Sequence, residues 1–309
     1  MTRSIPWRLQ GPDYGCLLPF SARLPLSLGA SLSRMRGRFA AHAARDWAEL
    51  AVGEPYVRTR TLQAAAQLWP NEPPAQALRQ RYQCTAREEW HAALIRAGRL
   101  DELTLDLAPA RRMLAEKPSD RGLLVVTAHF DSFIIGMLGL GLCGQRTNIA
   151  TSNVYVNDAV HPAVQAHFEA KYRAGERYLH GGSFLHVESS MRALLRALQR
   201  HETVVVVADA PAPEQGPGIW LQWLGQRRKL AEGAMRMARE TGSLMSAMLS
   251  VARTDTRIDW LCSSVLDPAQ DPDCAQQLFG FLEEPILAYP GRWWAAHLLG
   301  DFPVQGKGQ

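Results

Sequence analysis

Cysteine is scarce in this chain of 309 residues, and its placement excludes two common uses of the residue. Five cysteines occur, an odd number, and none belongs to a Cys-x-x-Cys pair: Cys16, Cys84, Cys143, Cys262 and Cys274. This spacing fits neither a disulfide framework nor a structural zinc site. His161, His167 and His186 have no acidic neighbours at metal-ligand spacing. We therefore expect no metal and no cofactor, and a reducing compartment, the cytoplasm.

Long apolar runs are also absent. No window of about 18 consecutive apolar residues occurs, so no transmembrane helix is expected. The first fifteen residues are polar and rich in turn formers, unlike a signal peptide. The best candidate for membrane contact is residues 15–32, which Pro19, Arg23 and Pro25 interrupt. A buried helical entry segment is our favoured interpretation. The alternative is an interfacial hairpin, which would place the protein at the inner face of the membrane.

Lysine is nearly missing among the positive residues. Of the 34 lysines and arginines only Lys117, Lys171, Lys229 and Lys307 are lysines, and the net charge is +4. Arginine suits phosphate and carboxylate partners, which it can bind through two parallel hydrogen bonds. A GC-rich genome would produce the same bias. No basic-aromatic repeat and no zinc finger occurs, so nucleic acid is not an expected partner.

The order of patterns along the chain predicts an α/β fold. Residues 1–120 have helical spacing without a strand pattern, and we predict helices over 33–52, 58–69, 74–98 and 107–116. Strands are predicted at 122–128, 146–151, 203–208, 219–223, 244–251 and 258–265. Helices are predicted at 133–143, 159–173, 188–200, 230–241 and 273–288. This alternation indicates a mixed central sheet flanked by helices. We divide the chain into a helical N-terminal region, 1–120, packed on an α/β domain, 121–309.

One strand-to-helix transition carries a residue suited to catalysis. The run of Leu123 to Val126 is apolar enough for a buried strand, and it stops at His129, after which FIIGMLGLGL begins a buried helix. Ligands of open α/β sheets bind at the carboxyl ends of strands. Histidine is a candidate general base there, because its ordinary pKa lies near neutrality. Asp209 is the last residue of the strand pattern TVVVVAD and so also lies at a carboxyl end.

Four stretches, in order, resemble a known family. They are HFDSF at 129–133, MRALLRALQRHETVVVVAD at 191–209, WLGQRRKLAEGAMRMARETGSLMSAML at 223–249 and PGRWW at 290–294. Together they resemble the bacterial lipid A biosynthesis acyltransferases, the lauroyl and myristoyl transferases of the lysophospholipid acyltransferase superfamily. The resemblance implies a lysophospholipid acyltransferase-like fold. It also implies transfer of an acyl group from acyl carrier protein or coenzyme A to a hydroxyl or amine. In that family His, after four intervening residues, is followed by Glu or Asp, and the carboxylate orients the imidazole.

This chain departs from that motif, because the position four intervening residues after His129 is Ile134. Asp131 is the nearest carboxylate. It either replaces the missing partner or caps the following helix, where Asp is favoured. Asp209 is a second candidate partner, since neighbouring strand ends converge. Its alternative role is that of a turn residue before Pro211.

Two arginines are candidate substrate contacts. The resemblance singles out Arg192 for a substrate anion, although a solvated helix face is the default interpretation of its surroundings. Arg228 belongs to a basic cluster, Arg227 to Lys229, that we expect to lie before a helix. That cluster could hold a pantetheine phosphate, meet an acidic carrier protein or serve only solubility.

We therefore predict an acyltransferase with His129 as base, Asp131 as its orienting group, and Arg192, Asp209 and Arg228 at the substrate. The acceptor would be a specialised metabolite or a carrier-bound molecule. One alternative is a binding protein that kept the fold but lost catalysis, which Ile134 favours. The other is a thioesterase-like hydrolase. An α/β-hydrolase is disfavoured because no Gly-x-Ser-x-Gly elbow occurs.

Overall fold

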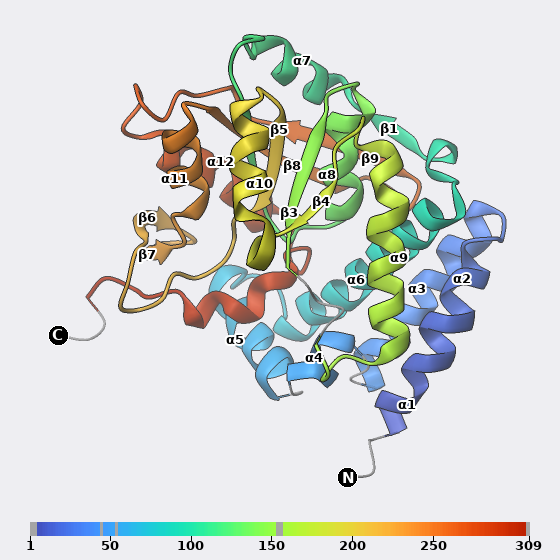
Figure 1. Cartoon of the computed structure of the whole chain (residues 1–309). Helices are drawn as coiled ribbons and strands as arrows, with labels where there is room; N and C mark the ends of the chain where they lie inside the picture. Colours follow the sequence, from blue (N-terminus) through green and yellow to red (C-terminus); the bar gives the residue numbers. More distant parts are fainter. Residues whose placement is uncertain (1–4, 44–45, 53–54, 153–156, 307–309) are drawn as a thin grey trace.

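The computed structural model describes residues 5–43, 46–52, 55–152 and 157–306. Helices fill the first hundred of these residues and pack beside an α/β region (Figure 1). These helices and helical turns are α1 (Ile5–Pro12), η1 (Asp13–Leu17), α2 (Leu18–Ser21), α3 (Leu26–Ala43), α4 (Trp47–Val52), η2 (Pro55–Thr59), α5 (Arg60–Leu68), α6 (Pro74–Ala97) and η3 (Leu100–Glu102). The helix predicted over 33–52 is thus two helices, α3 and α4.

A seven-stranded sheet forms the centre of the α/β region. Its strands, in spatial order, are β1 (Thr104–Asp106), β9 (Arg257–Cys262), β8 (Leu244–Ala252), β2 (Leu123–Thr127), β5 (Thr203–Val207), β3 (Thr147–Thr151) and β4 (Phe184–His186). The five strands from β8 to β4 run parallel. β9 is antiparallel to β8, and β1 is parallel to β9. The predicted mixed α/β sheet is confirmed.

Helices cover both faces of this sheet, which explains why its central strand, β2, is buried throughout. The covering helices are α7 (Ala108–Glu116), α8 (Phe133–Leu142), α9 (Pro162–Gly175), α10 (Val187–Gln199), α11 (Gly233–Thr241) and α12 (Cys274–Ala288). In Figure 1, α10 and α11 lie on one side of the sheet and α9 on the other. Leu124 and Val126 of β2 join the hydrophobic cluster on the first side, and Leu123 and Val125 join the cluster on the second.

Three strands were not predicted. β1 and β4 have three residues each, too few for a pattern. The third is β7 (Gln226–Leu230), which forms an antiparallel hairpin with β6 (Ile219–Trp223). Leu224 and Gly225 at its turn both have positive φ, as a tight two-residue hairpin turn requires. Helix α11 therefore begins at Gly233, later than predicted, and Arg228 lies in a strand.

The helical region and the sheet share one hydrophobic cluster. Trp90 and Leu94 of α6 belong to the same cluster as Val125 of β2 and Ile135 of α8. The helical region is thus packed on the α/β part, whereas the boundary at residue 120 stays a prediction. Within the described ranges, no helix is both long and apolar enough to cross a membrane.

Candidate active site

The register of the sheet brings His129 and Asp209 to the same edge. Thr127, the last residue of β2, pairs with Val207, the last residue of β5. Each candidate residue follows its strand end by two residues, so the two side chains leave adjacent parallel strands at the same level. The carboxyl edge of a parallel sheet is where α/β proteins place ligands.

The carboxylate beside His129 is Asp209. Asp209 Oδ1 lies 2.8 Å from His129 Nδ1, and its Oδ2 accepts the backbone N–H of His129 at 2.9 Å. The indole Nε1 of Trp293 also donates to Oδ2, at 2.7 Å, so the carboxylate takes part in three hydrogen bonds in all. Asp209 and Trp293 are fully buried. Three donors on two oxygens fix the carboxylate, so Nδ1 of His129 has a single rigid acceptor.

Asp209 and His129 each stabilise the charged form of the other. Burial works against an ionised Asp209, but attraction to His129 and the three hydrogen bonds outweigh burial and hold the pKa of Asp209 below its ordinary value. Burial alone would lower the pKa of His129. Attraction to Asp209 and the hydrogen bond with it together outweigh burial, so the pKa of His129 is raised above its ordinary value. The imidazole is therefore a stronger base than a free histidine.

The other ring nitrogen of His129 faces the open side of the site. The side chain is 41% exposed, and Nε2 has no hydrogen-bond partner in the described part of the chain. Phe133 contacts the imidazole edge to face at 5.4 Å between ring centres, and Trp294 lies 6.4 Å away. Phe133 and Trp294 contact each other at 4.7 Å. One side of the base is thus apolar and suited to an aliphatic chain.

Asp131 has a different environment from the one predicted. It makes no hydrogen bond with the His129 ring and does not cap α8, whose N-cap residue is Ser132. Its fully buried carboxylate binds Arg87, accepts from Arg292 at 2.8 Å and accepts the N–H of Ala252 at 2.9 Å. Burial opposes ionisation, but the two arginines outweigh it and hold the pKa of Asp131 below its ordinary value. The backbone at Asp131 has a positive φ of 49°, a left-handed conformation that Asp adopts more readily than most residues.

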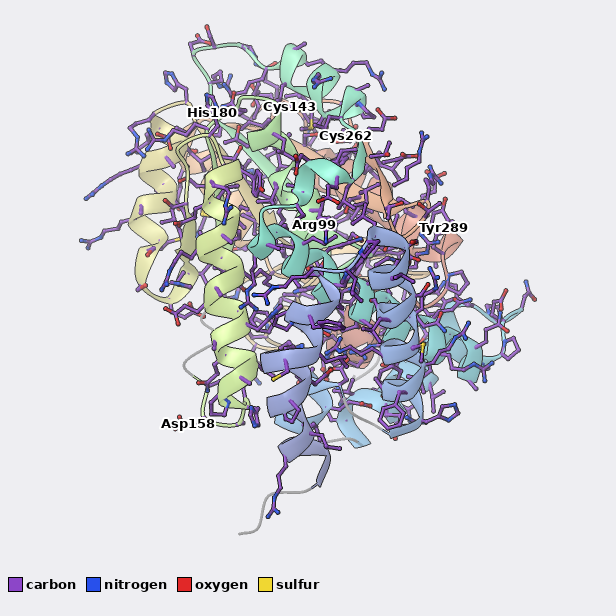
Figure 2. The ribbon with its side chains drawn as sticks, turned by 90° about the vertical axis from the view of Figure 1, so that its right-hand side faces the viewer. Arg99, Cys143, Asp158, His180, Cys262 and Tyr289 are labelled. Carbon is purple, nitrogen blue, oxygen red and sulfur yellow. The ribbon has the colours of Figure 1, made fainter. Side chains whose placement is uncertain are left out.

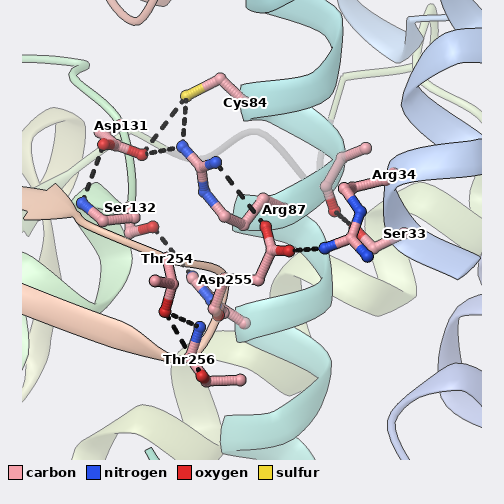
Figure 3. Close-up of polar contacts among 12 residues, drawn as sticks. Ser33, Arg34, Cys84, Arg87, Asp131, Ser132, Thr254, Asp255 and Thr256 are labelled. Atoms are coloured by element: carbon pink, nitrogen blue, oxygen red, sulfur yellow. Dashed lines mark hydrogen bonds and ion pairs between the residues drawn. The ribbon is translucent and has the colours of Figure 1, made fainter. Parts of the chain in front are cut away.

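Asp131 belongs to a line of alternating charges (Figure 3). Arg87 of α6 lies between Asp131 and Asp255, and Arg34 of α3 binds Asp255 from the other side. This line fastens two helices of the N-terminal region to the loop that carries His129. Asp131 is therefore placed to hold the loop rather than to contact a substrate.

The two arginines proposed from the sequence lie elsewhere. Arg192 is on the exposed face of α10, and Arg228 is almost fully buried in β7, where it donates to the carbonyl of Leu299 at 3.1 Å. Neither makes a hydrogen bond or ion pair with His129 or Asp209. The basic cluster is not the exposed group before a helix that the sequence suggested.

Three side chains around the histidine have roles that the sequence does not predict. Trp293, the first tryptophan of PGRWW, is the donor to Asp209. Phe133, at the start of the predicted buried helix, contacts the imidazole. Lys171 of α9 carries a positive charge that acts on His129. No spacing links residues 129, 171 and 293, so only the fold brings them together.

Comparisons with known proteins give few matches. No protein-family model and no curated protein matches the chain. Among solved structures, it is similar to the 1-acyl-sn-glycerophosphate (LPA) acyltransferase PlsC from Thermotoga maritima. The sequences are 12% identical, the match covers 84% of this chain and 96% of that chain, and the TM-score is 0.36. This distant likeness does not identify a reaction, which has to be inferred from the site itself.

Proposed function

We propose that the protein is an acyltransferase in which His129 is the general base. The donor would be a thioester of acyl carrier protein or coenzyme A, and the acceptor a hydroxyl or amine of a metabolite or carrier-bound molecule. The observation that supports this proposal is the contact of 2.8 Å between His129 Nδ1 and Asp209, which leaves Nε2 open beside two aromatic rings.

The geometry suits a transfer without a covalent enzyme intermediate. Asp209 accepts a hydrogen bond from the N–H at Nδ1 of His129, so the lone pair of Nε2 can take the proton of the acceptor. The acceptor oxygen or nitrogen then attacks the thioester carbonyl. When the tetrahedral intermediate collapses, the C–S bond breaks and the imidazolium returns its proton to the thiolate. Asp209 stabilises the imidazolium during this cycle.

The Asp209 contact also bears on the non-catalytic alternative. That alternative was based on Ile134, the position where the resembling family has a carboxylate. Here a carboxylate from a neighbouring strand occupies the orienting position, so the absence of one at 134 no longer argues against catalysis. A thioesterase would use the same base on water, and only product analysis separates it from a transferase.

We further propose that the helical region contacts a membrane surface from the cytoplasmic side. Large apolar side chains on α1 to α3 and η1 are exposed, and these helices face the viewer in Figure 2: Leu9, Leu17, Phe20, Leu28, Met35 and Phe39. The same stretch carries exposed basic residues such as Arg23 and Arg38. Apolar side chains beside arginines favour binding to an anionic lipid surface.

Sedimentation with phosphatidylglycerol vesicles tests this membrane contact: the protein should co-sediment, and Phe20→Ser together with Met35→Ser should abolish binding. Binding unaffected by that double substitution would contradict it.

Incubation with lauroyl-coenzyme A or lauroyl acyl carrier protein tests the reaction. Small-molecule and lipid extracts supply acceptors, and mass spectrometry follows the lauroyl group. A lauroylated acceptor made by the wild type and missing with His129→Ala supports the proposal. Free lauric acid as the sole product would instead indicate a thioesterase, and donor that is bound but unconsumed would indicate a binding protein.

A further inference from the structure

Lys171 is a buried cation that has no ion-pair partner among the residues that the structure describes. The residue is 4% exposed, and its Nζ lies 4.0 Å from the centre of the Phe168 ring and 5.2 Å from that of Tyr172. Within the described ranges, its ammonium makes no hydrogen bond and has no carboxylate within 4.0 Å. Lysine is almost never buried unless paired, because removing its charge from water costs several kcal/mol.

One aromatic ring joins Lys171 to the proposed base. The Phe133 ring that contacts His129 at 5.4 Å also lies 5.9 Å from the Lys171 Nζ. The positive charge of Lys171 acts on the imidazole, whose pKa it lowers against the larger effect of Asp209. Lys171 and His129 therefore lie near the same aromatic ring, that of Phe133.

A buried acidic residue, Glu88 of α6, acts on this lysine without contacting it. Glu88 is 1% exposed, and its Oε2 accepts the N–H of Ile134 at 3.3 Å, whereas Oε1 has no partner among the described residues. Burial lowers the pKa of Lys171, and attraction to Glu88 opposes that effect. The pair is too far apart to form a salt bridge, so no acceptor in the described part of the chain takes up the hydrogen-bonding capacity of the ammonium.

We propose that Lys171 binds a substrate oxyanion beside His129. The proposal rests on the acyl-transfer function and adds a binding residue to that site. The oxyanion has two candidate sources with the same chemistry: the thioester oxygen that becomes negative when the acceptor attacks, or a phosphate or carboxylate already on the acceptor. In either case an ammonium in a water-poor, aromatic setting stabilises negative charge more strongly than it would in water.

Calorimetric titration with dodecylphosphonate tests this inference without a known acceptor. The probe carries an oxyanion on an aliphatic chain and is used below its micelle concentration. The wild type should bind it, Lys171→Met should bind it about tenfold to hundredfold more weakly, and Lys171→Arg should recover most of the affinity. Lys117→Met, at the residue that follows α7, is the control and should bind as the wild type does. Absence of binding by the wild type, or equal binding by Lys171→Met, would overturn the inference.

A measurement on the wild type tests the inference even if the Lys171→Met variant does not fold. With four lysines in the chain, reductive dimethylation followed by peptide mass spectrometry resolves each one. Dodecylphosphonate should protect Lys171 and leave Lys117 unaffected, and unchanged labelling of Lys171 would overturn the inference. The variant Lys171→Met with Glu88→Gln removes both buried charges and serves where the single variant unfolds.

Kinetics with the true substrates separate the two sources of the oxyanion. A lower kcat at unchanged KM in Lys171→Met indicates the thioester oxygen, and a higher KM for the acceptor indicates an anion already on it. Unchanged kcat and KM would contradict both. The two proposals can be told apart. If phosphonate binding needs Lys171 but no acyl transfer depends on His129, the oxyanion site is supported and the proposed function is refuted.

Discussion

Asp209→Asn should remove most of the catalytic rate while leaving the shape of the site intact. Oδ2 of Asp209 accepts two N–H groups, from the backbone of His129 and from Trp293, and Oδ1 faces His129 Nδ1. In the variant, the single amide oxygen has to take the Oδ2 position, because two fixed donors point at it. The amide NH2 then faces Nδ1, which has to accept, and the ring proton moves to Nε2. A protonated Nε2 cannot accept the proton of the acceptor.

The size of the loss follows from this change of tautomer. In serine proteases, the corresponding Asp-to-Asn change lowers kcat by about 10⁴ with the geometry intact. The same cause operates here, so we expect a fall in kcat of about 10³ to 10⁴ at neutral pH. Two of the three hydrogen bonds to the carboxylate survive, so stability should fall far less than activity does.

The assay is release of free coenzyme A thiol from lauroyl-coenzyme A in the presence of the acceptor. Asp131→Asn is the matched control, since it replaces another fully buried aspartate in the same region. Asp131→Asn should retain kcat within a few fold. Equal losses from the two substitutions, or full activity in Asp209→Asn, would refute the assignment of Asp209 as the orienting carboxylate.

The remaining predictions concern stability and pH. Asp131→Asn should lower the free energy of unfolding by about 3–5 kcal/mol in urea titrations, because two arginines lose their buried counter-charge; an unchanged midpoint would contradict the role given to the charge line. The pH profile of kcat/KM should rise with pH and level off above a pKa higher than the ordinary 6.5 or so of histidine, since the raised pKa of His129 keeps it protonated at lower pH. Substitution of Asp209 by Asn should shift that rise to lower pH, and a profile independent of pH would exclude an imidazole base. Gly139→Ala should lower the free energy of unfolding by about 1–3 kcal/mol, because a Cβ there would lie 2.2 Å from Trp260 Nε1. Thermal unfolding measures the loss, and an unchanged midpoint would contradict the close packing of α8 on β9.

The sequence predicted the layers and the position of the base, because both depend on local pattern. Apolar runs define β2 and β5, and a polar residue that follows such a run lies at the ligand-binding edge. The choice between Asp131 and Asp209 could not be made in the same way. It depends on the positive φ at residue 131 and on the pairing of Thr127 with Val207, and neither is visible in a single sequence.

Long-range contacts account for most of what the sequence did not reveal. The donor on Trp293 reaches Asp209 across 84 positions, and Arg87 reaches Asp131 across 44. Arg192 and Arg228 were inferred from local charge and resemblance, which do not report burial. The hairpin of β6 and β7 was missed because its second strand, QRRKL, is polar and basic at three positions, unlike a typical strand.

The role of His129 as the base is tested most directly by the protonation state of its two ring nitrogens. Nitrogen-15 NMR of protein labelled at histidine reports this state, and the spectrum of His129→Gln assigns the signals. We expect the neutral ring to carry its proton on Nδ1, in a hydrogen bond to Asp209, with Nε2 unprotonated. A neutral ring with its proton on Nε2 would contradict it, since that tautomer has no lone pair facing the acceptor.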